Sequence, residues 1–230
     1  MTKANNGQGQ SDSVLALGQS WSLWEKYADR NGNSKNYGEN HEVIYTFHTL
    51  PQFAHLWKNT TYSTPSHLLY DIEREKIKSF YSRGSGNEEK SCDGFFLFKE
   101  NVQPKWEDSK NKQGCSLHVE LFDMIPKEID ELWKILIFEI VRQGFPHYEV
   151  IVGLRLLDRM QSQSKMKIEL WLSVSSKFGD DKIKAELYQE KITDIMTHFH
   201  KLISQLREIS LFSIINQNHF KSLNENKIVK

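Results

Sequence analysis

The chain has 230 residues and a mass of 27.0 kDa, and its 30 Lys and Arg residues balance its 30 Asp and Glu residues. This length suffices for one domain with a substantial core. Because non-specific coating of nucleic acid requires a strong excess of basic residues, the balance excludes that class of protein. It leaves open a pocket that binds a single nucleotide.

The N-terminal segment and the cysteines indicate the compartment. Residues 1–13 are rich in Asn, Gln, Gly and Ser and contain no apolar run, so we expect a disordered tail and no signal peptide. Cys92 and Cys115 show neither a CxxC motif nor zinc spacing. Two cysteines do not make a disulfide framework, so we expect a cytoplasmic protein. We expect a single domain over residues 14–215 and a second tail over 216–230.

The first half of the chain predicts strands, a helix and a long insertion. Residues 42–48 are typical of a strand, and a helix is expected to begin at Thr49, because Pro51 and Gln52 complete a capping box. Residues 61–92 are polar and charged, so we interpret them as an insertion loop that could include a short helix at 67–80. The run 94–99 is the next expected strand.

The second half alternates strands and longer helices. Strands are expected at 117–122, 150–157 and 167–174, the last two joined by a hairpin over residues 160–166. A helix after Pro126 carries an apolar stripe at the spacing of a core face, and a second such helix spans about 181–209. The pattern predicts an α+β fold, an antiparallel sheet with helices on one face.

Strand alternation assigns residues to faces. Ile168, Leu170, Leu172 and Val174 share one face of their strand, so Trp171 points to the other. Arg155, Leu157 and Arg159 are expected opposite Val152, Leu154 and Leu156 in the preceding strand.

The sequence contains no enzyme signature: GxxxxGK[ST], GxSxG and HExxH are all absent. We therefore expect no enzyme, no metal site and no cofactor. The informative segment is the polar loop after residue 99, where Trp106 is followed by Glu107 and Asp108, and a turn from Asn111 to Gly114 leads into the next strand. In isolation this segment favours a surface loop anchored by one tryptophan.

Taken together, the motifs resemble the eukaryotic translation initiation factor 4E family, cytosolic proteins that bind the 5′ cap of messenger RNA. The resemblance covers about residues 14–175 in the family's order. It rests on Trp21-Ser-Leu-Trp24, on Phe47-His-Thr49 with Phe53 and Trp57, on Pro104-Lys-Trp106-Glu107-Asp108 with Asn111-Lys-Gln-Gly114, and on Ile168-Glu-Leu-Trp171. The resemblance implies a curved sheet with a concave cap-binding face and about three helices on the convex face.

The resemblance also implies how the cap base is bound. The 7-methylguanine base is a cation, and stacking it between aromatic rings gains about 1–2 kcal/mol once desolvated. The stacking rings are expected to be Trp106 and Tyr37, the latter where the family usually has Trp. Glu107 is expected to accept hydrogen bonds from guanine N1–H and N2–H₂. Trp171 is expected to contact the N7-methyl group.

Cap phosphates require cations, and the resemblance assigns Arg159 and Lys167 to them, with Lys165 as an alternative because the hairpin is longer than in the family. One further basic position of the family is Ser116 here. Arg155 is a possible substitute, although Arg155 and Lys165 are equally typical of solvated surface charges.

Family members also bind an initiation scaffold (4G-type) or 4E-binding repressor proteins through their dorsal helices. The departures at Ala54, Lys134 and Ile135 imply that the family's usual mode of peptide binding is altered or lost, and Ile135 with Phe138 could serve another partner helix. We expect a monomer without a membrane partner. The dorsal residues expected to contact a partner are Leu50, Ala54, Trp57, Lys134, Ile135 and Phe138.

The expected function is cap binding in support of translation initiation. The first alternative is a cap-binding repressor or storage factor, which Tyr37 and Ala54 favour. The second is a protein-interaction module with a degenerate cap pocket, which Ser116 favours.

Overall fold

A computed structural model describes residues 15–27, 40–70, 78–83, 86–163, 165–174, 182–206 and 212–216. The expected tail over residues 1–13, Tyr37 and most of the expected tail over 216–230 lie outside these residues. Within them, no helix is long and apolar enough to cross a lipid bilayer.

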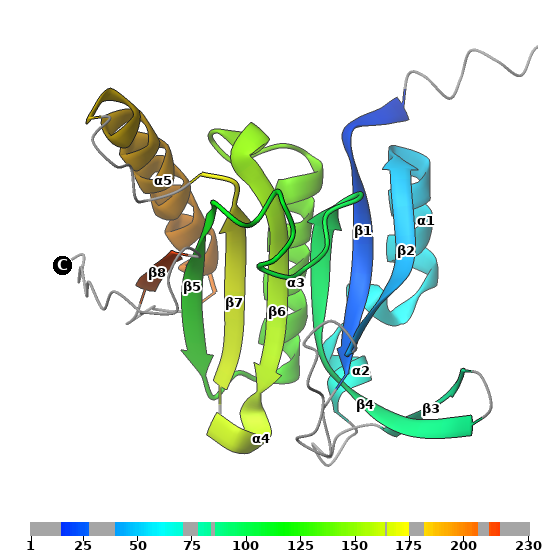
Figure 1. Ribbon diagram of the computed structural model, residues 1–230. Coiled ribbons are helices and arrows are strands. Elements are labelled where there is room, and N and C mark those ends of the chain that lie inside the picture. Colours follow the sequence, from blue (N-terminus) through cyan, green and yellow to red (C-terminus); the bar gives the residue numbers. More distant parts are fainter. Residues whose placement is uncertain are drawn as a thin grey trace, which may run out of the picture.

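One antiparallel sheet organises the fold, with strand order β2-β1-β4-β6-β7-β5-β8 and β3 paired to β4 (Figure 1). The expected fold class, an α+β protein with a curved antiparallel sheet, is confirmed. The strands are β1 (Ala16–Tyr27), β2 (His41–Thr49), β3 (Lys78–Arg83), β4 (Gly86–Lys99), β5 (Cys115–Phe122), β6 (Ile151–Arg159), β7 (Lys165–Leu172) and β8 (Phe212–Asn216).

Three longer helices and several short ones accompany the sheet. The helices are α1 (Leu50–Asn59), α2 (Ser66–Leu69), α3 (Pro126–Val141), α4 (Met160–Gln163) and α5 (Lys182–Ile203), with 3-10 turns η3 (Thr61–Ser63) and η4 (Tyr148–Val150). Figure 1 views the sheet from the side opposite α1 and α3. The capping box at the start of α1 is confirmed: Thr49 Oγ1 accepts from Gln52 N, and Gln52 Oε1 accepts from Thr49 N.

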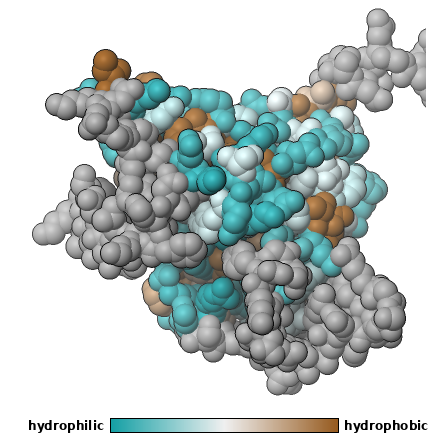
Figure 2. Space-filling model, viewed as in Figure 1, coloured by the Kyte–Doolittle hydropathy of each residue, from teal (hydrophilic) through white to brown (hydrophobic). Residues whose placement is uncertain are grey.

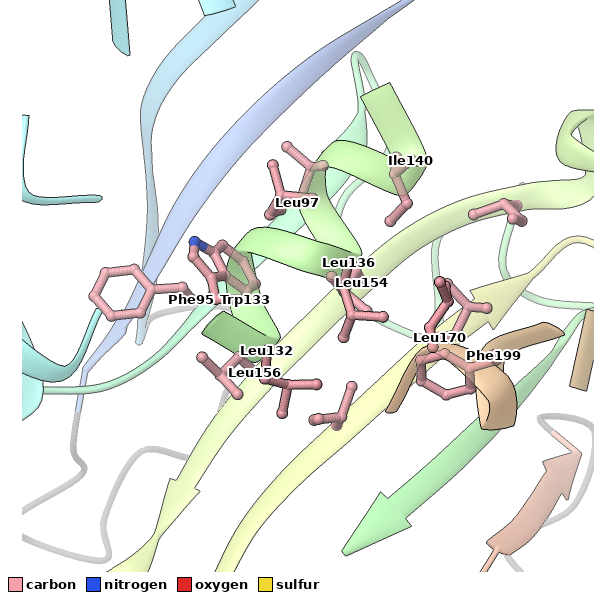
Figure 3. Packing of buried hydrophobic residues seen from close by; sticks show 14 of the residues in the cluster. Phe95, Leu97, Leu132, Trp133, Leu136, Ile140, Leu154, Leu156, Leu170 and Phe199 are labelled. Atoms are coloured by element: carbon pink, nitrogen blue, oxygen red, sulfur yellow. The ribbon is translucent and has the colours of Figure 1, made fainter. Parts of the chain in front are cut away.

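The main core lies between the sheet and α1, α3 and α5. Leu97, Leu154 and Leu170 project from neighbouring strands toward Leu136 of α3 and Phe199 of α5 (Figure 3). The apolar stripe expected on α3 is buried as predicted. Because this packing uses one face of each strand, the opposite face, called the open face below, carries the remaining side chains.

The segment over residues 61–92 contains more regular structure than the insertion loop we expected. It includes η3, α2, β3 and the beginning of β4, and the helix is shorter than the expected 67–80. Backbone hydrogen bonds hold β3 and β4 together, and they do not require apolar side chains. Because the segment is polar, its sequence lacks the alternation of apolar and polar residues from which strands are predicted.

The C-terminal part also differs from expectation. Helix α5 ends at Ile203 instead of about 209, and β8 follows it as an additional strand paired with β5. The hairpin between β6 and β7 forms as expected, with α4 in its turn. A register shift near Ile151 places Val152 in the cluster of the open face, not beside Leu154 as predicted.

Candidate functional site

Strand register brings side chains from five strands into rows across the open face. Residues paired across antiparallel strands point to the same face, as do residues two apart along one strand. One row crosses β1, β4, β6, β7 and β5 as Trp24, Phe96, Arg155, Glu169 and His118.

Two further rows flank it. On one side lie Ser22, Phe98, Gly153, Trp171 and Ser116; on the other lie Lys26, Gly94, Leu157, Lys167 and Glu120. Residues far apart in sequence therefore form one surface, with an aromatic end and a charged end. Figure 2 shows a mixture of hydrophilic and hydrophobic residues on the side viewed in Figure 1.

The aromatic end is a second apolar cluster, separate from the main core. Its buried members are Phe96, Phe98, Val102, Val152, Leu157 and Trp171, and Trp24 and Trp106 pack against them. Trp24 is not among the residues expected from the sequence to contact a ligand. The alternation Trp21, Leu23 against Ser22, Trp24 could have placed it on the open face, because Trp21 and Leu23 belong to the main core.

Trp106 stacks on Trp171. Their ring centroids are 3.5 Å apart and the ring planes differ by 9°. Trp171 is fully buried, and Phe98 meets it edge to face with the two ring centroids 5.4 Å apart. A separation of 3.5 Å is van der Waals contact, so no third ring fits between the two indoles in this conformation.

A buried ion network lies beside Trp171. Glu169 Oε2 accepts hydrogen bonds from Trp171 Nε1 at 3.1 Å and from Arg155 Nη1 at 2.9 Å. Glu169 Oε1 pairs with Lys167 Nζ at 2.9 Å. His118 Nε2 lies 3.9 Å from the same oxygen and 2.7 Å from Ser116 Oγ. Every side chain of this network except Lys167 is buried.

Burial and charge set the ionisation of this network. Burial alone would raise the pKa of Glu169, but the attraction of Arg155 and Lys167 holds it well below its usual range. Burial lowers the pKa of His118 to about 4. At neutral pH the network therefore contains two cations, one carboxylate and a neutral imidazole.

The loop that carries Trp106 is braced from within. Asp108 Oδ2 accepts from Gln103 N and its Oδ1 accepts from Lys110 N, both at 2.9 Å. The buried Asn111 donates from Nδ2 to the carbonyl oxygens of Gln103 and Lys105, both at 2.8 Å. At the end of the loop, a Cβ on Gly114 would collide with the Leu172 carbonyl oxygen, so the loop requires glycine there.

The two adjacent carboxylates of this loop, Asp108 and Glu107, differ in their exposure and in their hydrogen bonds. Asp108 is engaged by the loop backbone, whereas Glu107 is exposed. Among the hydrogen bonds and ion pairs of the described residues, none uses the Glu107 carboxylate. Glu107 is thus the carboxylate of this pair that can accept hydrogen bonds from a ligand.

Three of the four cations assigned to phosphates lie along the charged end. Arg159 is half-buried and pairs in register with Lys165, whose Nζ lies 2.8 Å from Glu120 Oε1. Lys167 bonds to Glu169. Arg155 differs: it is 3% exposed and bonded to Glu169, which argues against the phosphate contact suggested for it. Ser116 is also fully buried, so its position offers no surface contact.

Comparisons with known proteins assign this chain to a family. The family model described as eukaryotic initiation factor 4E matches residues 16–228. The chain belongs to the eukaryotic initiation factor 4E family. Among curated relatives, eukaryotic translation initiation factor 4E1 of Drosophila melanogaster is 28% identical over 151 residues, covering 66% of this chain and 47% of the relative. The factor 4E of Aplysia californica is 27% identical over 157 residues, covering 67% of this chain and 60% of the relative. The chain thus spans about half to three fifths of their length.

Solved structures show the same fold. A complex of Caenorhabditis elegans eIF4E-3 with the 4E-binding protein Mextli has a TM-score of 0.62 at 19% identity, covering 89% of this chain and 94% of that chain. Ascaris suum eIF4E-3 with m7G cap has a TM-score of 0.60 at 20% identity, covering 91% and 96%. A Schistosome eIF4E complex with m7GpppG and 4E-BP has a TM-score of 0.62 at 18% identity, covering 92% and 94%.

On the side of the sheet opposite the open face, α1 and α3 of this initiation factor 4E family member form an aromatic patch. Trp57 and Phe138 meet edge to face with centroids 5.0 Å apart, and both contact Phe53. Phe138 is 42% exposed and Leu50 is 47% exposed. Ala54 is half-buried beside them in α1.

The remaining expected dorsal residues behave differently. Ile135 packs against the main core, and exposed Lys134 forms an ion pair with Glu131 at 2.9 Å. The patch of Trp57, Phe138 and Leu50 is therefore the exposed apolar part of the expected dorsal surface. Tyr37, the expected second stacking ring, lies outside the described residues.

Proposed function

We propose that this chain binds the 7-methylguanosine 5′ cap of messenger RNA and thereby supports translation initiation in the cytoplasm. The observation that carries the proposal is Trp106, half-buried against Trp171 and followed directly by the exposed Glu107. The Ascaris and Schistosome proteins of similar fold were solved with cap or cap-containing dinucleotides. In this role the chain acts as a binding protein, not a catalyst.

The base is recognised by charge and by hydrogen bonding. The 7-methylated base is a cation and gains about 2 kcal/mol from desolvated contact with an indole face. We assign Trp106 and Tyr37 to the two stacking faces. Glu107 accepts from guanine N1–H and N2–H₂, and adenine lacks that pair of donors.

Cap binding requires the stacked indoles to separate. A base on the far side of Trp106 would be a full ring thickness from Trp171, too far for Trp171 to contact the methyl group. Opening the aromatic pair costs about 0.5–1.5 kcal/mol beyond area burial. The cation–π gain of about 2 kcal/mol offsets this cost for a methylated base, whereas an uncharged base gains less.

The register orders the phosphate contacts. A strand rises about 3.3 Å per residue, so Lys167 lies about 13 Å along β7 from Trp171, and Lys165, paired with Arg159, lies about 20 Å away. Among the cations that we assign to the phosphates, Lys167 therefore lies closest to the base site. Lys165 and Arg159 serve the more distal phosphates, and we assign Arg155 no direct contact.

Binding of 7-methyl-GTP and of GTP, followed by tryptophan fluorescence, tests the proposal. We expect quenching by 7-methyl-GTP at concentrations where GTP has little effect, and loss of this response in Trp106→Ala. Trp57→Phe, on the opposite side of the sheet, is the matched control and should respond like the wild type. Equal responses to the two nucleotides would refute cap binding and favour an interaction module.

We further propose that the patch of Trp57, Phe138 and Leu50 binds an amphipathic helix of an initiation scaffold (4G-type) or a 4E-binding repressor. The Caenorhabditis and Schistosome proteins of similar fold were solved with such binding proteins. Adding the chain to a cap-dependent translation extract separates the two roles. Stimulation supports an initiation factor, and inhibition relieved by Trp106→Ala supports a cap-binding repressor.

A further inference from the structure

We infer that Glu169 is a positioning residue that fixes the Trp171 indole and thereby sets the preference for a methylated base. This inference rests on the proposed cap-binding function and extends it to a residue that touches no ligand. Glu169 is the side chain on which both the methyl-contacting tryptophan and the nearest phosphate cation converge.

The geometry around Glu169 is specific. Glu169 and Trp171 are two residues apart on β7 and share the open face. The indole Nε1–H donates to Oε2 at 3.1 Å, and the Arg155 guanidinium donates to the same oxygen at 2.9 Å. Lys167 Nζ binds the other oxygen at 2.9 Å. One carboxylate therefore accepts from three donors while only 3% exposed.

The hydrogen bond determines which edge of the indole points inward. Turning the ring over would place a C–H edge against the carboxylate and leave the buried N–H without an acceptor, a costly exchange in a dry environment. Trp106 covers one face of the ring, and Phe98 approaches it edge on. The position of Trp171 is thus fixed by an interaction that a purely apolar pocket would not provide.

Packing alone does not require a charged network at this place. Replacing a buried ion pair by apolar side chains of similar volume is often neutral or stabilising. Contact with a methyl group, in contrast, depends on the ring lying within van der Waals distance, because dispersion attraction falls steeply with small gaps. Glu169 and Arg155 therefore act on the placement of Trp171 more than on the stability of the sheet.

The first test measures the ratio of the dissociation constants of GTP and 7-methyl-GTP. Glu169→Gln replaces two carboxylate oxygens with one carbonyl oxygen for the same three donors, and we expect the ratio to fall about tenfold, the scale of a hydrogen bond to a charged group. Glu120→Gln is the matched control: Glu120 also pairs with a lysine of β7 but lies outside the network, and we expect an unchanged ratio.

Two further variants separate positioning from folding. The double variant Arg155→Met with Glu169→Leu removes both members of the buried ion pair, so no buried charge is left without its partner and the fold should persist. Its Tm should fall by no more than the loss of the Trp171 N–H acceptor requires, while the ratio of the dissociation constants still falls. Trp171→Phe should lower the ratio as Glu169→Gln does, and combining the two should lower it little further, because both remove one interaction. Additive effects would overturn the inference.

The ligand-free protein offers an independent measurement. In ¹⁵N-labelled protein, the Trp171 indole N–H resonance should shift in Glu169→Gln and stay in place in Glu120→Gln. An unmoved resonance would overturn the inference.

The outcomes separate this inference from the proposed function. The positioning role fails, and cap binding stands, if the wild type prefers 7-methyl-GTP and Trp171→Phe lowers the ratio but Glu169→Gln does not. If the wild type binds both nucleotides equally, the proposed function itself fails, and the role of Glu169 in methyl preference fails with it.

Discussion

Removing the Asn111 side chain should weaken cap binding without touching the ligand. Asn111 holds the loop of Trp106 and Glu107 through two hydrogen bonds of 2.8 Å to the carbonyl oxygens of Gln103 and Lys105. At about 0.5–1.5 kcal/mol net for each bond, Asn111→Ala costs about 1–3 kcal/mol.

The surrounding structure places the expected cost in the lower part of that range. The Gln103 carbonyl still accepts from Lys105 N, and the Lys105 carbonyl still accepts from Asp108 N. Asn111 Oδ1 is also buried without a hydrogen-bond partner in the described structure, so the variant removes an unfavourable group as well. We expect a net loss of about 1–2 kcal/mol, borne mainly by the loop.

This loss sets an upper limit on the effect on affinity. A ligand that binds only the ordered loop loses affinity in proportion to the fraction of loop that remains ordered, so about 1–2 kcal/mol corresponds to at most about 5- to 30-fold. Fluorescence titration with 7-methyl-GTP measures this change, and hydrogen exchange of the loop amides should accelerate in parallel. The exposed Gln103 contributes its backbone, not its side chain, so Gln103→Ala is the control. Wild-type affinity in Asn111→Ala, or an equal loss in Gln103→Ala, would refute the reasoning.

Three further predictions address the base, the fold and the pH dependence. Glu107→Gln should lower the affinity for 7-methyl-GTP about tenfold or more, because it removes a charged acceptor. It should also reduce the preference for 7-methyl-GTP over 7-methyl-ATP. An unchanged preference, measured by calorimetry, would contradict this role of Glu107. Thr49→Ala should lower the free energy of unfolding by about 1 kcal/mol through loss of the α1 cap, measured by urea denaturation, whereas an unchanged urea midpoint would argue against it. Burial lowers the pKa of His118 from 6.5 to about 4, so the unfolded chain takes up its proton first as the pH falls, and the free energy of unfolding should fall by up to about 3 kcal/mol between pH 6.5 and 4. Urea titrations across this range should show a smaller fall in His118→Gln, and an equal fall in both proteins would exclude His118 as its source.

The sequence was sufficient to predict five strands of the sheet (β2, β4, β5, β6 and β7), the core stripes of α3 and α5, and the face of Trp171. These features depend on the spacing of apolar residues within one segment. Side chains alternate between the two faces along β7, and the apolar residues of α3 recur at helical spacing. The capping box at Thr49 is equally local. The motif of the loop from Trp106 to Gly114 was also recognisable in the sequence. The structure shows why it contains these residue types: Asp108 and Asn111 hydrogen-bond the loop backbone, and Gly114 permits the close approach of β7.

The ion network could not be predicted, because it depends on pairing between strands. Glu169 meets Arg155 through the register of β6 with β7, which is set by a hairpin turn that contains α4. Read alone, Arg155 is typical of a surface charge, and nothing local distinguishes it from one buried against a carboxylate. The ribbon of β3 with β4 escaped prediction for a related reason, since its pairing is a backbone property of a polar segment.

Several cations of the open face already have carboxylate partners. Arg155 and Lys167 share Glu169, Lys165 pairs with Glu120, and Lys26 lies 3.4 Å from Asp93. A phosphate that approaches these cations must compete with carboxylates already in place, so it is attracted less than it would be by the same cations without partners. If the chain binds the cap as proposed, discrimination between bases must come mainly from the aromatic end, where the exposed Glu107 has no such competing partner. Glu169, the carboxylate that pairs with Arg155 and Lys167, also accepts the hydrogen bond of the Trp171 indole, so the charged and aromatic ends of the face are linked through one residue.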